Sequence, residues 1–121
     1  MDNIESVTIK KMTADDVDKI IAIESEAYGE HHWSKDSFLN EIHNELARYY
    51  TLFTSSGEIA GYAGTWHILD EAHITNIAIS PNYRRRGYGE ALLKRVIDDC
   101  YTEMIKYITL EVRVSNTPAI N

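Results

Sequence analysis

The chain has 121 residues, of which 44% are hydrophobic, so it is long enough for one compact domain with a core. Its formal net charge of -7 opposes nucleic acid binding and favours a cationic partner such as an amine or a basic peptide. No apolar run approaches the roughly 20 residues of a membrane span, and the N-terminus lacks a basic, then apolar, signal pattern. We therefore expect a single cytoplasmic domain over residues 1–121 that binds neither nucleic acid nor a membrane.

Cysteine and histidine usage argues against metal and redox chemistry. The single cysteine, Cys100, excludes an internal disulfide and a cysteine-based zinc site. The five histidines show no recurring ligand spacing, so we predict no metal site.

The first half of the chain predicts a strand, two helices and a further strand. Residues 5–11 alternate as a strand, and Thr13 with Asp16 resembles a capping arrangement ahead of a helix. Ser34 is placed to cap a second helix, which ends before the β-prone run 49–54. The apolar stripes of the two helices comprise Val17, Ile20, Ile21 and Tyr28 in the first, and Phe38, Leu39, Ile42 and Leu46 in the second.

The second half predicts a mixed α/β architecture. Turn residues separate the strands 49–54, 59–68 and 72–80, which we expect to pair as an antiparallel meander. An amphipathic helix over 87–103 and an alternating strand over 107–114 then make a right-handed βαβ crossover with strand 72–80. The predicted apolar side of that helix contains Leu92, Leu93, Val96, Ile97, Cys100 and Met104. We expect Cys100 to be a buried thiol there rather than a nucleophile.

The loop 80–89 leaves a strand and opens a helix, which makes it the strongest candidate for a ligand site. A helix start offers unpaired N–H donors and partial positive charge, and Gly87 and Gly89 allow close approach of a phosphate or pyrophosphate. The P-loop is excluded because its Gly-Lys-Ser/Thr ending is missing, and the dinucleotide fingerprint because no third glycine follows three residues after the second. Taken alone, the basic run 84–86 is explained as well by a solvated basic turn as by a phosphate site. The acidic composition of the chain disfavours RNA binding.

The residues from Asn76 to Leu93 resemble the acetyl-CoA motif of the GNAT superfamily of N-acetyltransferases. That motif is Arg or Gln, two residues, then Gly-x-Gly or Gly-x-Ala, as at Arg84, Gly87 and Gly89. The segments that most resemble the bacterial ribosomal-protein-alanine N-acetyltransferases (RimI type) are His32-Trp33-Ser34 with Phe38, Asp70 to Ala78, and Leu110 to Asn116. The resemblance covers nearly the whole chain and implies the GNAT, or acyl-CoA N-acyltransferase, fold with its mixed, mostly antiparallel sheet.

The resemblance also implies a binding mode for acetyl-CoA as co-substrate. In the family a strand backbone pairs with the pantetheine arm, and the following turn holds the pyrophosphate largely through main-chain N–H groups. The cofactor-binding residues implied for this chain are Ile77, Ala78, Ile79, Arg84, Arg85, Arg86, Gly87, Tyr88, Gly89, Glu90 and Asn116. Without the motif, Asn116 reads as a polar residue that ends a strand.

Acetyl transfer to an amine requires the uncharged amine, and an α-amino group titrates near 8. Glu111 matches the family's proton acceptor, although alternation alone favours a solvated neighbour pair of Glu111 with Arg113. A backbone N–H near Ile79 is the expected donor to the developing oxyanion. We expect direct attack in a ternary complex.

The implied function is acetylation of the N-terminal α-amino group of a protein, with the alanine of ribosomal protein bS18 as the family's usual substrate. Alternatives are an acetyltransferase of a small-molecule amine and a catalytically impaired acetyl-CoA-binding fragment.

Family members continue into a further helix and two strands, and the helix carries a tyrosine proton donor, so we expect the chain to be C-terminally truncated and to lack that acid. The unpaired apolar edge of strand 107–114 favours a homodimer. Trp33 and Phe38 suit either a peptide groove or, preferably, local core packing.

Overall fold

The structure is a computed structural model that describes residues 6–29 and 33–110. Its helices and strands are β1 (Thr8–Lys11), α1 (Val17–Tyr28), α2 (Lys35–Ile42), β2 (Ala47–Phe53), β3 (Ile59–Ile68), β4 (Glu71–Ile79), α3 (Tyr88–Thr102) and β5 (Tyr107–Leu110). The strands form one sheet in the order β1-β2-β3-β4-β5, antiparallel except for the parallel β4–β5 pair. The predicted mixed sheet with a βαβ crossover through α3 is confirmed.

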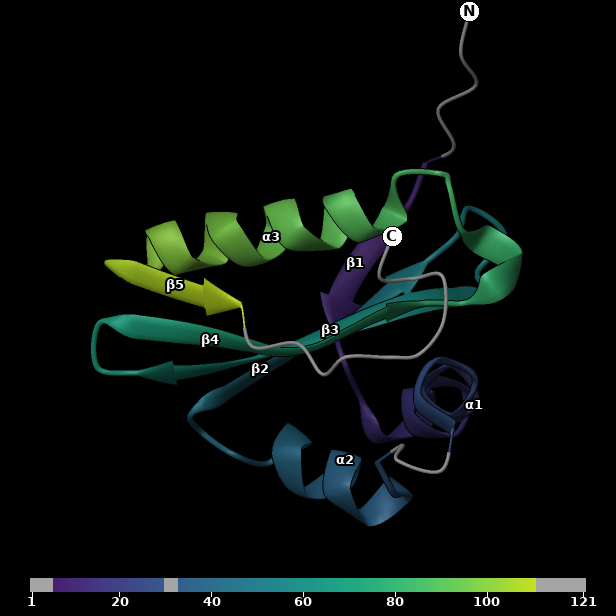
Figure 1. The fold of residues 1–121 in the computed structure, drawn as a ribbon, viewed down its shortest axis with the longest axis horizontal. Coiled ribbons are helices and arrows are strands. Elements are labelled where there is room, and N and C mark those ends of the chain that lie inside the picture. Colours follow the sequence, from purple (N-terminus) through teal and green to yellow (C-terminus); the bar gives the residue numbers. More distant parts are fainter. Residues whose placement is uncertain (1–5, 30–32, 111–121) are drawn as a thin grey trace, which may run out of the picture.

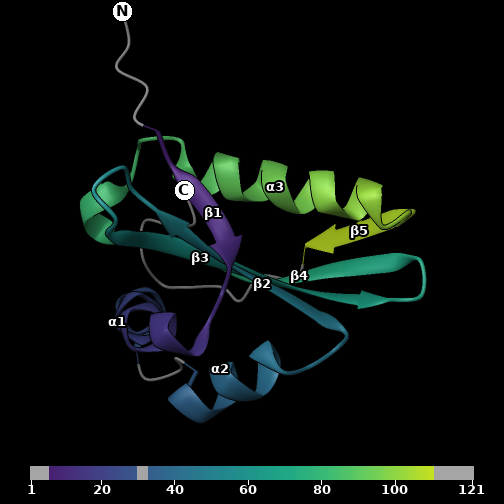
Figure 2. The same ribbon diagram turned by 180° about the vertical axis from the view of Figure 1, so that it is seen from behind.

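The sheet has α1 and α2 on one face and α3 on the other (Figures 1 and 2). Capping residues fix where the first two helices begin. Asp16 accepts a hydrogen bond from the backbone N–H of Thr13 at 3.0 Å, and this predicted capping arrangement closes the 3-10 turn Ala14–Asp16 that leads directly into α1. The Ser34 hydroxyl accepts from the N–H of Ser37 at 3.1 Å and so caps α2. In the described part of the chain, no helix has the length and hydropathy needed to cross a membrane.

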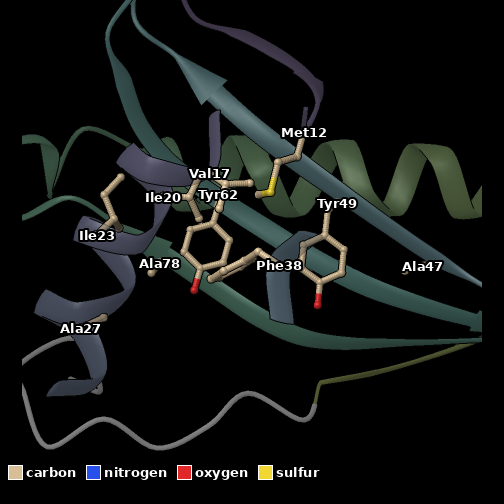
Figure 3. Packing of buried hydrophobic residues seen from close by; sticks show 10 residues of the cluster. All are labelled: Met12, Val17, Ile20, Ile23, Ala27, Phe38, Ala47, Tyr49, Tyr62 and Ala78. Atoms are coloured by element: carbon tan, nitrogen blue, oxygen red, sulfur yellow. The ribbon is translucent and has the colours of Figure 1, made fainter. Parts of the chain in front are cut away.

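Each face of the sheet buries its own cluster of apolar side chains. Figure 3 shows the cluster beneath α1 and α2, which consists of Met12, Val17, Ile20, Ile23, Ala27, Phe38, Ala47, Tyr49, Tyr62 and Ala78. The cluster beneath α3 includes Leu92, Val96 and Cys100, all of which are buried as predicted. Burial at about 25 cal/mol per Å² of apolar surface makes these two clusters the main stabilising contribution.

Three predicted apolar contacts are wrong. Ile97 is 46% exposed, because only the stripe of α3 that faces the sheet is covered. Met104 is 81% exposed and lies beyond α3, which ends at Thr102. Leu46 is 49% exposed and lies outside α2, which ends at Ile42. The side chain of Asn44 accepts a hydrogen bond from the Leu46 N–H at 2.9 Å, and this local turn replaces the next helical turn.

Candidate active site

The turn between β4 and α3 is shaped for close approach of a ligand to the backbone. Gly87 is the N-cap of α3 with φ of 79°, a left-handed conformation that suits glycine. Among the residues that the structure describes, no side chain makes a capping hydrogen bond at the start of α3, and the first turn leaves N–H groups that the helix itself does not satisfy. A Cβ added at Gly87 would meet no atom within 4 Å, and one at Gly89 would only meet Ile79 at 3.9 Å. The Cβ positions of these two glycines therefore face open space.

The second half of β4 presents backbone groups along an edge of the sheet. The carbonyl of Ile77 accepts from the Tyr28 hydroxyl at 3.4 Å, and that of Ile79 accepts from Nε of Arg84 at 3.3 Å. In an antiparallel strand the N–H and C=O of one residue point to the same side. Both residues therefore direct their N–H groups away from β3. The described part of β5 reaches only Ile74, where it pairs with Leu110, so these N–H groups lie beyond it.

The three consecutive arginines have different surroundings. Arg84 is half-buried and turned toward the end of β4 through its bond to Ile79. The Arg86 guanidinium lies 5.3 Å from the ring centroid of Tyr83. Arg85 is exposed and has φ of 65°, an unusual conformation for a residue with a side chain.

A sequence model of the acetyltransferase (GNAT) family matches residues 15–121. The chain belongs to the GNAT family. A protein of Bacillus subtilis, provisionally named a ribosomal protein bS18-alanine N-acetyltransferase, is 38% identical over 92% of this chain and 73% of its own length. The Escherichia coli K12 enzyme of that name is 37% identical over 93% of this chain and 74% of its own length.

Solved GNAT structures confirm the predicted fold. The crystal structure of the ribosomal-protein-S18-alanine N-acetyltransferase from Escherichia coli superimposes with a TM-score of 0.79 at 35% identity, over 95% of this chain and 72% of that one. The PaiA N-acetyltransferase from Thermoplasma acidophilum, solved with coenzyme A, gives a TM-score of 0.72 at 19% identity, over 83% of this chain and 75% of that one. The second likeness shows the shared fold alone. GNAT acetyltransferases take their acetyl group from acetyl-CoA, the co-substrate predicted above.

Two predicted site residues of this GNAT chain, Glu111 and Asn116, lie outside the described residues. The structure brings the others together at one end of the sheet. Ile77 to Ile79 form the β4 edge, and the turn 84–87 leads directly into the first residues of α3.

The sequence analysis missed a buried carboxylate in α1. Glu24 is completely buried and accepts hydrogen bonds from the Tyr62 hydroxyl and, at 2.7 Å, from the backbone N–H of Trp33. It therefore ties α1 to β3 and to the start of α2. Its position on the inner face of the amphipathic helix α1 was the available signal, since a buried glutamate must find partners.

The predicted core packing of Trp33 and Phe38 is confirmed. Their ring centroids lie 5.4 Å apart, and Phe38 is fully buried with its ring edge against Tyr62. Tyr49 completes this aromatic group at 6.3 Å from Phe38. These rings support α2 on the sheet.

The side chains with shifted pKa values lie at the far end of α3. Burial raises the pKa of Cys100, and the negative charges of Glu103 and Asp99 raise it further. The thiol therefore stays protonated and is a poor nucleophile. Burial lowers the pKa of His67, against the opposing charge of Glu103. For Glu103 itself, hydrogen bonds from Arg48 and the charge of His67 outweigh burial and lower the pKa. None of these groups belongs to the turn or the β4 edge.

Proposed function

We propose that the protein transfers the acetyl group of acetyl-CoA to the N-terminal α-amino group of a protein, the alanine of ribosomal protein bS18. The observation that carries this proposal is the identity of 37–38% to enzymes named for that reaction, extending over more than nine tenths of the chain. It therefore includes both the β4 edge and the turn before α3.

For the co-substrate we propose two contact regions. The edge N–H groups of Ile77 and Ile79, with the Ala78 backbone between them, would pair with the amides of pantetheine, as a strand pairs with a peptide. The N–H groups from Arg85 to Glu90 would hold the diphosphate, with Arg84 and Arg86 supplying positive charge beside it. The open space at Gly87 and Gly89 supports this assignment. Asn116 remains a predicted contact.

The chemistry of this chain's residues then divides into proton removal and charge stabilisation. Glu111 is the proposed acceptor of the amine proton, and it follows directly in sequence on Leu110, the last described residue of β5. A backbone N–H at the β4 edge, near Ile79, would donate to the developing oxyanion. Because Cys100 is buried and protonated, no acetyl-cysteine is proposed, and the amine attacks the thioester directly.

Acetylation of a small amine is the weaker alternative. The aminoglycoside acetyltransferase that superimposes on this chain with a TM-score of 0.71 is only 14% identical, so it shares the fold and says nothing about the acceptor. Acetyl-CoA turnover should be measured with a peptide that begins with alanine, the same peptide with a blocked N-terminus, a polyamine and an aminoglycoside. Turnover confined to the unblocked peptide is expected. Turnover of the polyamine or the aminoglycoside instead would refute the proposed acceptor.

A cytoplasmic location and a homodimer stay predictions. The dimer is supported by the apolar side chains Tyr107, Ile108 and Leu110 of β5, which are 62%, 42% and 64% exposed. A monomeric elution profile at high protein concentration would contradict it.

A further inference from the structure

The end of the sheet opposite the turn before α3 exposes apolar side chains. Three segments meet there: the turn before β2, the turn between β3 and β4, and the connection from α3 to β5 (Figures 1 and 2). Main-chain hydrogen bonds join them. The Asp70 carbonyl accepts from the N–H of Lys106 at 2.7 Å, and the Leu46 carbonyl accepts from the N–H of His67 at 2.6 Å. We define the end patch as the exposed apolar residues of these segments, which are Leu46, Ile68, Leu69 and Met104, with exposed fractions of 49%, 39%, 95% and 81%.

Two residues of the end patch are not required by the turns that hold them. Leu69 and Met104 have left-handed φ angles of 56° and 62°, a conformation in which glycine is less strained. Met104 directly follows Glu103, the C-cap of α3, at a position where helices commonly have glycine. Both side chains also leave apolar surface in water. The fold therefore does not account for them, whereas contact with a partner does.

Acidic side chains outnumber basic ones around the end patch. Segments 44–48, 67–71 and 101–106 contain the acidic residues Glu45, Asp70, Glu71 and Glu103 and the basic residues Arg48 and Lys106. Arg48 is already paired with Glu103 at 2.9 Å. Burial lowers the pKa of His67, so this side chain adds no positive charge at neutral pH. The patch is therefore an apolar surface with acidic surroundings.

These charges decide which partner fits the end patch. In a symmetric contact a second copy of the chain would bring the same acidic residues face to face, and like charges across an interface cost free energy. An anionic membrane surface is disfavoured for the same reason. A basic protein with apolar side chains of its own matches both features. The acceptor in the proposed function is a ribosomal protein, and proteins that bind RNA carry clustered lysine and arginine.

The end patch lies far from the β4 edge assigned above to acetyl-CoA. Leu69 precedes Ile77 by eight residues, which corresponds to about 26 Å at about 3.3 Å per strand residue. An extended acceptor chain needs about eight residues to span that distance. Only parts of the acceptor beyond its N-terminal segment can therefore reach the patch.

We propose that the end patch docks the body of the acceptor protein while the acceptor's N-terminus lies at the β4 edge. This inference rests on the proposed function. It makes the whole acceptor a better ligand than its N-terminal peptide, because the peptide reaches only one of the two surfaces.

The test compares full-length ribosomal protein bS18 with a synthetic peptide of about its first six residues, which is too short to reach the end patch. Leu69→Gly and Met104→Gly remove the apolar side chains and suit the left-handed turns, so each variant should fold with a Tm equal to or above that of the wild type. Each should raise the calorimetric Kd for bS18 about tenfold, because an apolar contact is lost. The kcat/KM for the short peptide should stay unchanged.

Two further variants separate the patch from apolar surface in general and from its charge. Ile97→Ala truncates an exposed apolar side chain of α3 outside the end patch, and it should leave both the bS18 Kd and the peptide kcat/KM unchanged. Added salt should raise the Kd of the wild-type protein for bS18. Glu45→Lys reverses an exposed charge beside Leu46, so it should weaken bS18 binding and lessen the dependence on salt.

Equal bS18 Kd values for the wild-type protein and both glycine variants would overturn the inference. So would the absence of bS18 binding by the wild-type protein, or a wild-type dimer in sedimentation that either glycine variant abolishes, since the patch would then bind a second copy. Failure of the proposed function looks different. In that case the wild-type protein acetylates neither bS18 nor the short peptide, whereas failure of the docking alone leaves acetylation of the peptide intact.

Discussion

Substitution of Gly87 by alanine separates the ligand role of this glycine from its structural role, because Gly57 offers a matched control. Both glycines have left-handed φ angles, 79° and 88°, and a Cβ at either meets no atom within 4 Å. Each alanine should therefore cost about 1–2 kcal/mol of backbone strain and lower the Tm by about 4–8 °C. The two variants should be similarly destabilised.

Only Gly87→Ala should weaken acetyl-CoA binding. The added methyl group would hold the diphosphate away from the first N–H groups of α3, and loss of one hydrogen bond to a charged group costs about 1.5–3 kcal/mol. This corresponds to a 10- to 150-fold rise in Kd, on the order of a factor of ten per 1.4 kcal/mol. Calorimetric titration of both variants, beside their melting curves, is the assay. Equal acetyl-CoA affinities in Gly87→Ala and Gly57→Ala would refute the diphosphate assignment.

Three further predictions concern the fold. Gly64→Ala should cost about 1–3 kcal/mol in denaturant unfolding, since its Cβ overlaps the Tyr49 ring, and an unchanged midpoint would contradict that packing. Glu24→Ala should destabilise by about 1–3 kcal/mol for each of the two hydrogen bonds lost, and Glu24→Gln by less, because glutamine keeps a side-chain oxygen that can accept; equal losses would argue against the hydrogen bonds. Burial lowers the pKa of His67, so stability is complete above the usual histidine pKa of about 6.5 and falls as the pH drops below it. The Tm of His67→Gln should no longer fall with pH in this range, whereas the Tm of the exposed His43→Gln variant should keep the wild-type pH dependence. An unchanged pH dependence of Tm in the His67 variant would assign it to another group.

Much of the fold could be predicted because local chemistry marks the ends of its elements. The capping residues Thr13 and Ser34 place α1 and α2, and the turn residues on either side of 59–68 give β3 its observed bounds. The helix predicted over 87–103 is α3, with Gly87 as its N-cap. Strand β1 begins at Thr8, later than the predicted residue 5, because Thr8 pairs with Phe53, the last residue of the neighbouring strand β2. Alternation in one strand carries no information about the length of its partner.

The site was predictable where it consists of backbone and only partly where it consists of side chains. The glycines and the strand-to-helix context predicted the turn before α3, and the structure has Gly87 at the start of that helix. The bulge at Thr75 in β4 could not be predicted, because it depends on the register between β3 and β4. The partners of Glu24 likewise come from elements far apart in sequence. Predictions for Glu111 and Asn116 stay open, since both lie outside the described residues.

The account depends most on main-chain amides at the start of α3 and along the β4 edge as the holders of coenzyme A. Amide chemical shifts recorded by NMR during a titration with coenzyme A test this directly. The amides of Ile77, Ile79 and residues 87–90 should shift together and saturate at one ligand concentration. Saturable binding that leaves those amides unshifted while amides elsewhere respond would contradict it.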